Sequence, residues 1–267
     1  MPSPQHQTLP PEFAQPLAQA SDRLASFVRQ VYWYDQLSST NDVAAAYAER
    51  GAPEGVVVLS RSQSAGRGRF GRTWQSPPGA GLYVSILLRP TSHAVPLLTL
   101  AAGVAIADGI RAATALEATL KWPNDVYLGH RKLAGILAEG GATSAGLSHV
   151  IVGCGINLRP AAYPPDVASR ATSIEGDLGR AVDPGTLLVE CLAAWSARYD
   201  DLQGGRGGAV LDAWRAYARP TLGRSVEWDD RGDARRGVAE DVDGTGALVI
   251  RTDAGMARAI SGEVRWI

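Results

Sequence analysis

The pattern of hydrophobic and polar positions predicts a chain of alternating strands and helices up to about residue 219. Short apolar runs bounded by turn residues indicate buried strands, and apolar residues spaced by three or four indicate helices. The expected strands are Val31–Tyr34, Val56–Leu59, Leu82–Leu88, Thr119–Lys121, Val126–Leu128, Leu133–Glu139 and His149–Val152. The expected helices are Glu12–Arg29, Ala44–Glu49, Pro96–Ala115, Pro184–Leu202 and Ala209–Ala218. Pro96–Ala115 is the most apolar of these, so we expect it at the centre of the core.

The pattern changes after Pro220 to strict alternation at a period of two, which is typical of strands with one buried face. The expected strands are Ser225–Trp228, Arg236–Glu240, Ala247–Arg251 and Met256–Ile260, with turns at Asp230–Asp233 and Asp243–Gly246. This size suits a small SH3-like β-barrel packed on the main domain, because so short a module is marginally stable alone. The chain then divides into residues 1–30, 31–219 and 220–267. The first 12 residues hold four of the sixteen prolines and predict a disordered tail.

Composition narrows the function classes. The 267 residues carry a net charge of -1, which argues against a general polyanion binder but allows a local basic site. Two cysteines and four scattered histidines predict neither a disulfide framework nor a metal held by protein side chains alone. The N-terminus lacks a basic and apolar leader, and the longest apolar stretch is too short to span a bilayer. We therefore expect a cytoplasmic protein without a membrane partner.

The basic residues are divided unevenly, with 24 Arg and two Lys, at positions 121 and 132. A nucleotide-level bias explains the scarcity of lysine. It does not explain why lysine is kept at these two positions, eleven residues apart.

The most informative stretch is residues 61–74, RSQSAGRGRFGRTW, here called the Gly/Arg segment. It carries four Arg and three Gly, and no acidic residue occurs between Gly55 and Ala107. Forked guanidinium donors beside flexible backbone predict a site for a phosphate or another anion. A solvated surface loop and an RNA-binding segment are the alternatives. The spacing of its glycines is not followed by a helix, so a dinucleotide fingerprint is not supported, and neither a Walker A loop nor the kinase triplets occur.

Three further segments place polar residues at strand ends. Leu120–Val126 presents a cation, an amide and a carboxylate at a corner between two strands, although an ordinary turn has the same composition. In Arg131–Glu139, Gly135 predicts close approach of a ligand or another backbone, and Lys132 can project into a cleft or guard a strand edge. Val152–Asn157 is a strand end whose glycines also allow close approach.

Together these segments resemble the biotin protein ligases, or biotin–[acetyl-CoA-carboxylase] ligases, over about residues 31–267. The motifs that carry the resemblance are Ser39–Asn41, Gln63–Trp74, Lys121–Asp125, Lys132–Leu137, Gly153–Asn157, Ala171–Ile174 and Ile260–Val264. Cys154 departs from the small or apolar residue expected at its position. About 30 residues precede the first expected strand of the main domain, too few for the DNA-binding domain of the longer family members, so we expect the short form and no DNA partner.

The resemblance implies an α/β (α+β) catalytic domain similar to class II aminoacyl-tRNA synthetases, with a mixed central sheet, followed by the SH3-like domain. It implies that biotin and ATP, with Mg²⁺, form biotinyl-5'-AMP, and that the biotinyl group passes to a lysine of a biotin carboxyl carrier domain. The implied biotin contacts are Ser39, Thr40, Asn41, Gln63, Gly66, Arg67, Gly68, Arg69, Lys132 and Gly135. The implied ATP or adenylate contacts are Arg69, Arg72, Trp74, Lys121, Asn124 and Asn157, with Trp74 against the adenine. A homodimer is left open.

Elementary chemistry supports the same mechanism. A carboxylic acid with a reference pKa near ~4 is already ionised at neutral pH, so activation needs charge cancellation rather than a base. Mg²⁺, Arg67, Arg69, Arg72 and Lys132 can supply it. The acceptor lysine must lose a proton, and Asp125 is the candidate base or orienting group. The Gly/Arg segment is expected to act as a lid. The rivals are a lipoate–protein ligase and a non-catalytic RNA- or ssDNA-binding protein.

Overall fold

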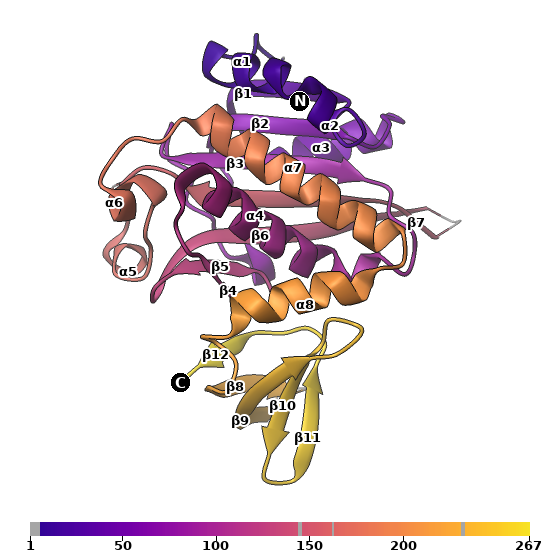
Figure 1. The fold of residues 1–267 in the computed structure, drawn as a ribbon, viewed down its shortest axis with the longest axis vertical. Helices are drawn as coiled ribbons and strands as arrows, with labels where there is room; N and C mark the ends of the chain where they lie inside the picture. Colours follow the sequence, from indigo (N-terminus) through magenta and orange to yellow (C-terminus); the bar gives the residue numbers. More distant parts are fainter. Residues whose placement is uncertain (1–5, 144–145, 162, 231–232) are drawn as a thin grey trace.

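A seven-stranded mixed sheet forms the centre of the larger part of the molecule (Figure 1). The computed structural model describes residues 6–143, 146–161, 163–230 and 233–267. The strand order is β1-β2-β3-β7-β6-β5-β4, in which β1 and β2 are parallel and the other neighbours antiparallel. The strands are β1 (Gln30–Leu37), β2 (Val56–Gln63), β3 (Gly81–Leu88), β4 (Thr119–Lys121), β5 (Asp125–Leu128), β6 (Arg131–Thr143) and β7 (Gly146–Asn157).

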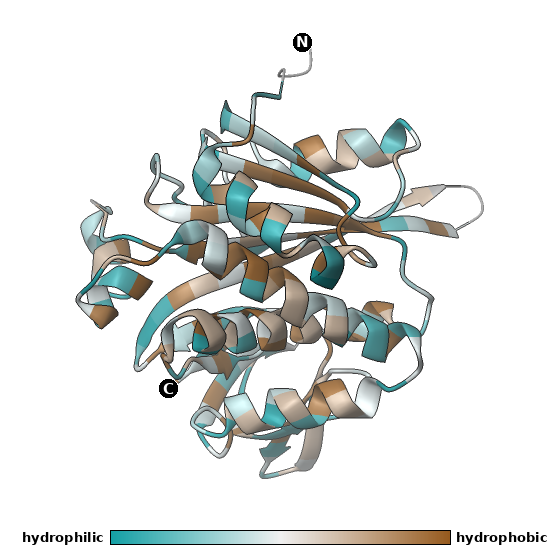
Figure 2. Cartoon of the chain, turned by 45° about the horizontal axis from the view of Figure 1, so that its top comes forward, coloured by the Kyte–Doolittle hydropathy of each residue, from teal (hydrophilic) through white to brown (hydrophobic). Residues whose placement is uncertain are grey.

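Helices cover both faces of this sheet, in keeping with the alternation of its strands. Val57 and Leu59 of β2 point into the larger core under α1, α4, α7 and α8, whereas Val56 and Val58 point into the smaller core under α3. Figure 2 shows the resulting hydrophobic stretches along the strands. The helices are α1 (Pro11–Gln19), α2 (Ser21–Leu24), α3 (Thr40–Glu49), α4 (Leu98–Thr114), α5 (Pro165–Ala168), α6 (Ile174–Leu178), α7 (Pro184–Gln203) and α8 (Gly207–Ala218), with short 3₁₀ turns at Arg69–Gly71 and Val95–Leu97.

The most apolar helix, α4, is the centre of the larger core as expected. With the turn before it, the stretch Val95–Thr114 is long and apolar enough to cross a membrane by length and composition, but it is mostly buried within the protein. It packs on α7 so closely that a Cβ at Gly109 would lie 2.6 Å from Cys191. Its hydrophobicity is therefore used for packing inside the protein.

The C-terminal module is a five-stranded antiparallel sheet, which agrees with the expected SH3-like domain. Its strands, in the order β11-β10-β9-β8-β12, are β8 (Ser225–Asp230), β9 (Asp233–Val242), β10 (Leu248–Thr252), β11 (Gly255–Ala259) and β12 (Val264–Trp266). The module is bonded to the seven-stranded sheet at the β4–β5 corner. Trp122 Nε1 donates to the carbonyl of Gly246 at 2.9 Å, and Thr221 Oγ1 donates to the carbonyl of Leu120 at 2.9 Å.

Several boundaries differ from the expectations. The tail does not extend to residue 12: Gln7 pairs with Trp33 of the edge strand β1, and α1 begins at Pro11. The helix expected at 12–29 is broken at Ala20, where ψ is 10°, into α1 and α2. The strands at 133–139 and 149–152 are longer, since they pair as the hairpin β6–β7. Helices α5 and α6 and strand β12 were not expected, and the turn at 230–233 lies partly outside the described residues.

Candidate active site

A cavity of about 580 Å³ opens between the seven-stranded sheet and the C-terminal module. Its walls come from the N-terminus of α3, the Gly/Arg segment, the β4–β5 corner, strands β6 and β7, the segment 163–171 and the end of the C-terminal module. It brings together the expected residues Ser39, Thr40, Asn41, Gln63, Arg67, Gly68, Arg69, Arg72, Trp74, Lys121, Asn124, Asp125, Lys132, Gly135 and Asn157. Segments distant in sequence therefore converge on one site.

Gly66 is the exception among the expected contacts. It lies behind the cavity wall, where a Cβ would stand 2.4 Å from the Trp74 carbonyl oxygen and 2.8 Å from Ser76 Oγ. Its carbonyl accepts from the Trp74 backbone N–H at 2.9 Å. Gly66 therefore allows the Gly/Arg segment to fold back on itself, and the expectation that it contacts biotin is not supported by its position.

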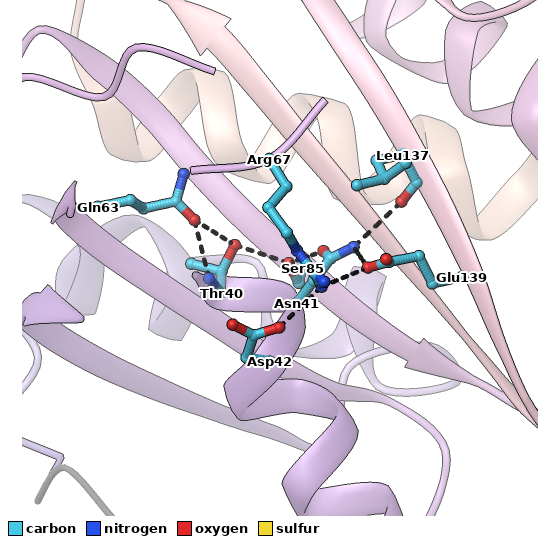
Figure 3. A network of polar contacts seen from close by, with 8 residues as sticks. All are labelled: Thr40, Asn41, Asp42, Gln63, Arg67, Ser85, Leu137 and Glu139. Atoms are coloured by element: carbon cyan, nitrogen blue, oxygen red, sulfur yellow. Dashed lines mark hydrogen bonds and ion pairs between the residues drawn. The ribbon is translucent and has the colours of Figure 1, made fainter. Parts of the chain in front are cut away.

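One end of the cavity, at the start of α3, is lined by the uncharged side chains of Thr40, Asn41 and Gln63 (Figure 3). Their polar network continues, away from these groups, to the charged side chains of Asp42, Arg67 and Glu139. The Thr40 backbone N–H and hydroxyl both donate to Gln63 Oε1, at 2.8 and 3.1 Å. Ser85 Oγ lies 2.7 Å from Thr40 Oγ1 and 2.6 Å from Asn41 Oδ1. Hydroxyls and amides at fixed positions suit a small neutral ligand that has both donors and acceptors.

The Gly/Arg segment folds as a short hairpin. Arg67 and Thr73 form a bridge, and the Gly68 N–H donates to the Arg72 carbonyl at 2.7 Å. At its tip Phe70 has a φ of 57° and a ψ of 37°, the left-handed region that bulky residues rarely adopt. The Phe70 ring is 62% exposed, with the Arg69 guanidinium 4.9 Å from its centroid. Backbone bonds thus hold a cationic hairpin over the cavity.

Trp74 lies flat against strands β6 and β7, on Gly135 and Gly155, which are partners across the two strands. A Cβ at Gly155 would stand 2.2 Å from Trp74 Nε1, and one at Gly135 would stand 3.0 Å from Cζ3. The close approach that we predicted at Gly135 is therefore made by an indole of the same chain. Among the described residues Trp74 Nε1 is buried without a hydrogen-bond partner. The unpartnered indole N–H therefore lies against the sheet at Gly155.

The two lysines flank one carboxylate. Lys132 Nζ lies 2.6 Å from Asp125 Oδ1 and 5.4 Å from the centroid of the Trp74 ring. Lys121 is the β-sheet partner of Asp125 and lies 4.8 Å from the Trp266 ring. Burial lowers the pKa of Lys121, although Asp125 opposes that shift. The site therefore holds a compact positive centre around a single acidic side chain.

The two expected amides are engaged in structural bonds. Asn124 Nδ2 donates to the Ile136 carbonyl at 2.8 Å, and its Oδ1 is 3.4 Å from Arg69 Nη1. Asn157 Nδ2 donates to the Thr172 carbonyl at 2.9 Å, and its Oδ1 accepts from the Tyr163 hydroxyl at 3.2 Å. Both side chains brace the walls of the cavity while facing it.

The charged groups around the cavity are not all available to a ligand. Arg67 is paired with Asp42 and Glu139, each at 2.7 Å, and Arg72 forms an ion pair with Glu263. Burial lowers the pKa of the Arg69 guanidinium, which remains far above neutrality as for any arginine. Cys154, the residue that departed from the family pattern, is buried, and burial raises the pKa of its thiol. It has no feature of a nucleophile.

Sequence reasoning missed the contribution of four residues. Glu263 and Trp266 bring the C-terminal module into the cavity wall, whereas we expected site residues from the main domain alone. Ser85 on β3 and Glu139 on β6 hold the α3 network from the sheet. A serine within the apolar strand Leu82–Leu88 and an acid closing the apolar run Leu133–Glu139 were signals that could have identified the last two.

Comparisons with known proteins agree with this geometry. The Biotin/lipoate A/B protein ligase family matches residues 33–157, and the Biotin protein ligase C terminal domain matches residues 221–265. A biotin–[acetyl-CoA-carboxylase] ligase of Paracoccus denitrificans is 37% identical over 239 residues, covering 85% of this chain and 96% of that protein. The chain belongs to the biotin protein ligase family.

Other members of the family extend the comparison. A biotin–[acetyl-CoA-carboxylase] ligase of Mycobacterium tuberculosis is 35% identical over 231 residues, covering 83% of each chain. The solved biotin protein ligase of Aquifex aeolicus in complex with biotin and ATP superposes with a TM-score of 0.76 at 26% identity, covering 90% of this chain and all of that one. The expected family and fold are thus confirmed.

Proposed function

We propose that this protein is an ATP-dependent biotin ligase that forms biotinyl-5'-AMP and transfers the biotinyl group to a lysine of a biotin carboxyl carrier domain. One observation carries the proposal: a single cavity joins a neutral hydrogen-bonding end at α3 to a cationic end at Lys132 and the Gly/Arg segment. Biotin has the matching halves, a ureido ring and a carboxylate. The family and the neighbour bound to biotin and ATP support the same activity.

The neutral end is proposed to bind the ureido ring. Thr40, Gln63 and Ser39 supply hydroxyl and amide groups that can accept from the two ring N–H groups and donate to the ring carbonyl. Their fixed geometry suits a ligand that has both polarities, whereas a purely apolar ring makes no hydrogen bond with them. This end therefore discriminates biotin from lipoate, whose dithiolane ring offers no N–H or carbonyl group.

In the first half-reaction a carboxylate oxygen of biotin attacks the α-phosphorus of ATP. A new C–O–P linkage forms, the bond from the α-phosphorus to the bridging oxygen breaks, and pyrophosphate leaves with that electron pair. Lys132 and Arg69 are proposed to neutralise the approaching anions, with Trp74 against the adenine. Groups already fixed at such positions stabilise developing charge without reorganisation.

Mg²⁺ is proposed to enter with the nucleotide. Among the described residues no group of three or more His, Cys, Asp or Glu side chains could hold a metal ion. Asp125 and Glu263 face the cavity, and Mg²⁺ commonly uses one or two carboxylates together with substrate phosphates. When bound, the ion would neutralise phosphate charge. The residues present fit that minimal role.

In the second half-reaction the Nζ of the acceptor lysine attacks the acyl carbon of biotinyl-AMP. An amide bond forms, the acyl C–O bond breaks and AMP leaves with its phosphate. Asp125 is proposed to orient the incoming ammonium or accept its proton, since it is the carboxylate between Lys121 and Lys132. Asp125→Asn is expected to slow transfer more than adenylate formation, and normal rates of both steps would remove this role.

Pyrophosphate release tests the activity directly. The purified protein is given Mg-ATP together with biotin, with lipoate or with neither. Pyrophosphate release is expected only in the sample that contains biotin. Release that does not require biotin, or no release at all, would reject the proposal. A carrier domain whose acceptor lysine is replaced by arginine is the control for transfer. The domain boundaries at 30 and 219, the cytoplasmic location and the lack of DNA binding stay predictions.

A further inference from the structure

The Gly/Arg segment is anchored to the catalytic sheet through Arg67 (Figure 3). Arg67 Nη2 lies 2.7 Å from Asp42 Oδ1 on α3 and 2.7 Å from Glu139 Oε2 on β6. All three side chains are partly exposed, at 43, 46 and 37%. Ion pairs this exposed are weak. The anchor can therefore open and close as substrates pass.

Glu139 makes a second contact with the same oxygen atom. Its Oε2 accepts from Asn41 Nδ2 at 2.6 Å, while Asn41 Oδ1 lies 2.6 Å from Ser85 Oγ. A carboxylate only accepts, so it fixes the orientation of the Asn41 amide. Gly153 keeps the amide in place, because a Cβ there would stand 2.0 Å from Asn41 Oδ1. One oxygen atom of Glu139 thus contacts both the buried Asn41 amide and the partly exposed Arg67 guanidinium.

The orientation of Asn41 reaches the proposed biotin-binding groups through Ser85. Ser85 Oγ lies 2.7 Å from Thr40 Oγ1, which donates to Gln63 Oε1 at 3.1 Å. Ser85 is fully buried, so these bonds have no competition from water. An unbroken series of contacts therefore joins the residues that face the ureido ring to Arg67 on the lid.

We propose that Glu139 is a positioning residue that couples biotin recognition to closure of the Gly/Arg segment. This inference rests on the proposed function. A ligand that fixes Thr40 and Gln63 also fixes Asn41, and Asn41 holds the Glu139 carboxylate in the position that receives Arg67. Binding of biotin therefore favours the closed segment, which retains the reactive adenylate.

Three variants separate the two contacts of Glu139. Glu139→Gln keeps an acceptor for Asn41 and removes the negative charge that Arg67 uses. Asp42→Asn is the matched control, because it removes the other charge on Arg67 and leaves the Glu139 contact with Asn41 intact. Glu139→Ala removes both contacts. Each purified variant is loaded with labelled biotinyl-AMP, chased with unlabelled biotinyl-AMP in the absence of acceptor, and assayed for KM.

The expected results differ between the variants. Glu139→Gln and Asp42→Asn should each release biotinyl-AMP about threefold faster, in keeping with a weak exposed ion pair. Their KM for biotin should stay within about twofold of the wild-type value. Glu139→Ala should release the adenylate faster and also raise the KM for biotin about tenfold, because Asn41 loses its charged acceptor. The KM for ATP should not change.

Two outcomes would overturn the coupling. One is a KM for biotin in Glu139→Ala that equals the value in Glu139→Gln. The other is an equal rise in the KM for ATP together with a lower melting temperature, which indicates a structural role alone. Failure of the proposed function is distinguishable, since wild-type protein would then release no pyrophosphate with biotin.

Discussion

Arg72, at the base of the hairpin formed by the Gly/Arg segment, forms an ion pair with Glu263 in the C-terminal module. This contact joins the Gly/Arg segment to the C-terminal module, whereas Arg67 joins it to α3 and β6. The segment is therefore held at both sides of the cavity. Glu263 therefore holds the Gly/Arg segment from the C-terminal module, although it is about 190 residues away from Arg72 in the chain.

Glu263→Gln is predicted to raise the KM for ATP by about two- to fivefold, the effect of one partly exposed ion pair. Arg72 would lose the anchor that directs it toward the triphosphate, whereas the α3 network would be unchanged. Steady-state pyrophosphate release checks this with ATP and biotin varied separately. Glu227→Gln is the control, because Glu227 pairs with Arg236 on the same module. An unchanged KM for ATP would contradict the prediction.

The same ion pair predicts a pH dependence. The hydrogen bond from Arg72 lowers the pKa of Glu263, and burial opposes the shift. The pKa of Glu263 is lower in the folded protein than in the unfolded protein, where it lies near ~4.3, so the ion pair contributes stability at pH values above that unfolded-state pKa. The contribution is lost as the pH falls through the folded-state pKa of Glu263. The melting temperatures of wild type and Glu263→Gln should therefore differ at pH 7 and converge in more acid solution. A constant difference down to pH of about 3 would argue against it.

Lys132→Arg is predicted to lower the rate of adenylation by about 10²–10³, although it keeps the charge. Nζ sits 2.6 Å from Asp125 Oδ1 beside Gly135, and a planar guanidinium is wider and places its N–H donors differently from a compact ammonium. Single-turnover formation of biotinyl-AMP measures this. Arg131→Lys is the matched control on the adjacent residue, whose partner is Asp177. Wild-type adenylation by Lys132→Arg would refute the requirement for a compact ammonium.

Gly155→Ala is predicted to reduce biotin-dependent pyrophosphate release at least about tenfold while the protein still folds. The added methyl group would stand 2.2 Å from Trp74 Nε1, so the indole must leave the surface of β6 and β7. Gly208→Ala is the control, since a Cβ there meets no atom within 4 Å. Full activity of Gly155→Ala would show that the packing of Trp74 on β6 and β7 is not required for activity.

Local sequence pattern was sufficient to single out residues that line the cavity. Lys121 and Lys132 stood out because lysine is otherwise absent from the sequence, and each lies in a short motif whose neighbours share the cavity. The strand Thr119–Lys121 was found at its correct bounds, since a buried strand beside a polar corner carries its own signal. The central helix was equally clear, because it is the most apolar of the expected helices.

The pairing of strands and the contacts between distant segments could not be predicted from local sequence pattern. Strands β6 and β7 extend beyond their apolar runs because each supplies the other's hydrogen-bond partners, and polar or glycine positions there carry no strand pattern of their own. Glu263 and Ser85 reach the site for the same reason, as contacts created by packing. Gly66 is a motif position for which we expected a ligand contact, and the structure shows in addition that only a residue without a side chain fits between Trp74 and Ser76.

Limited trypsin digestion should reveal whether the Gly/Arg segment closes over the adenylate. Arg67, Arg69 and Arg72 are cleavage sites on the segment, and each carries an interaction that ligand binding is expected to strengthen. Cleavage there should be slower with biotinyl-AMP than without it, whereas cleavage at exposed Arg180, away from the cavity, should not change. Glu139→Gln should lose part of the protection, because Arg67 would then keep one charged partner. Equal cleavage of the segment with and without biotinyl-AMP would contradict its role as a lid.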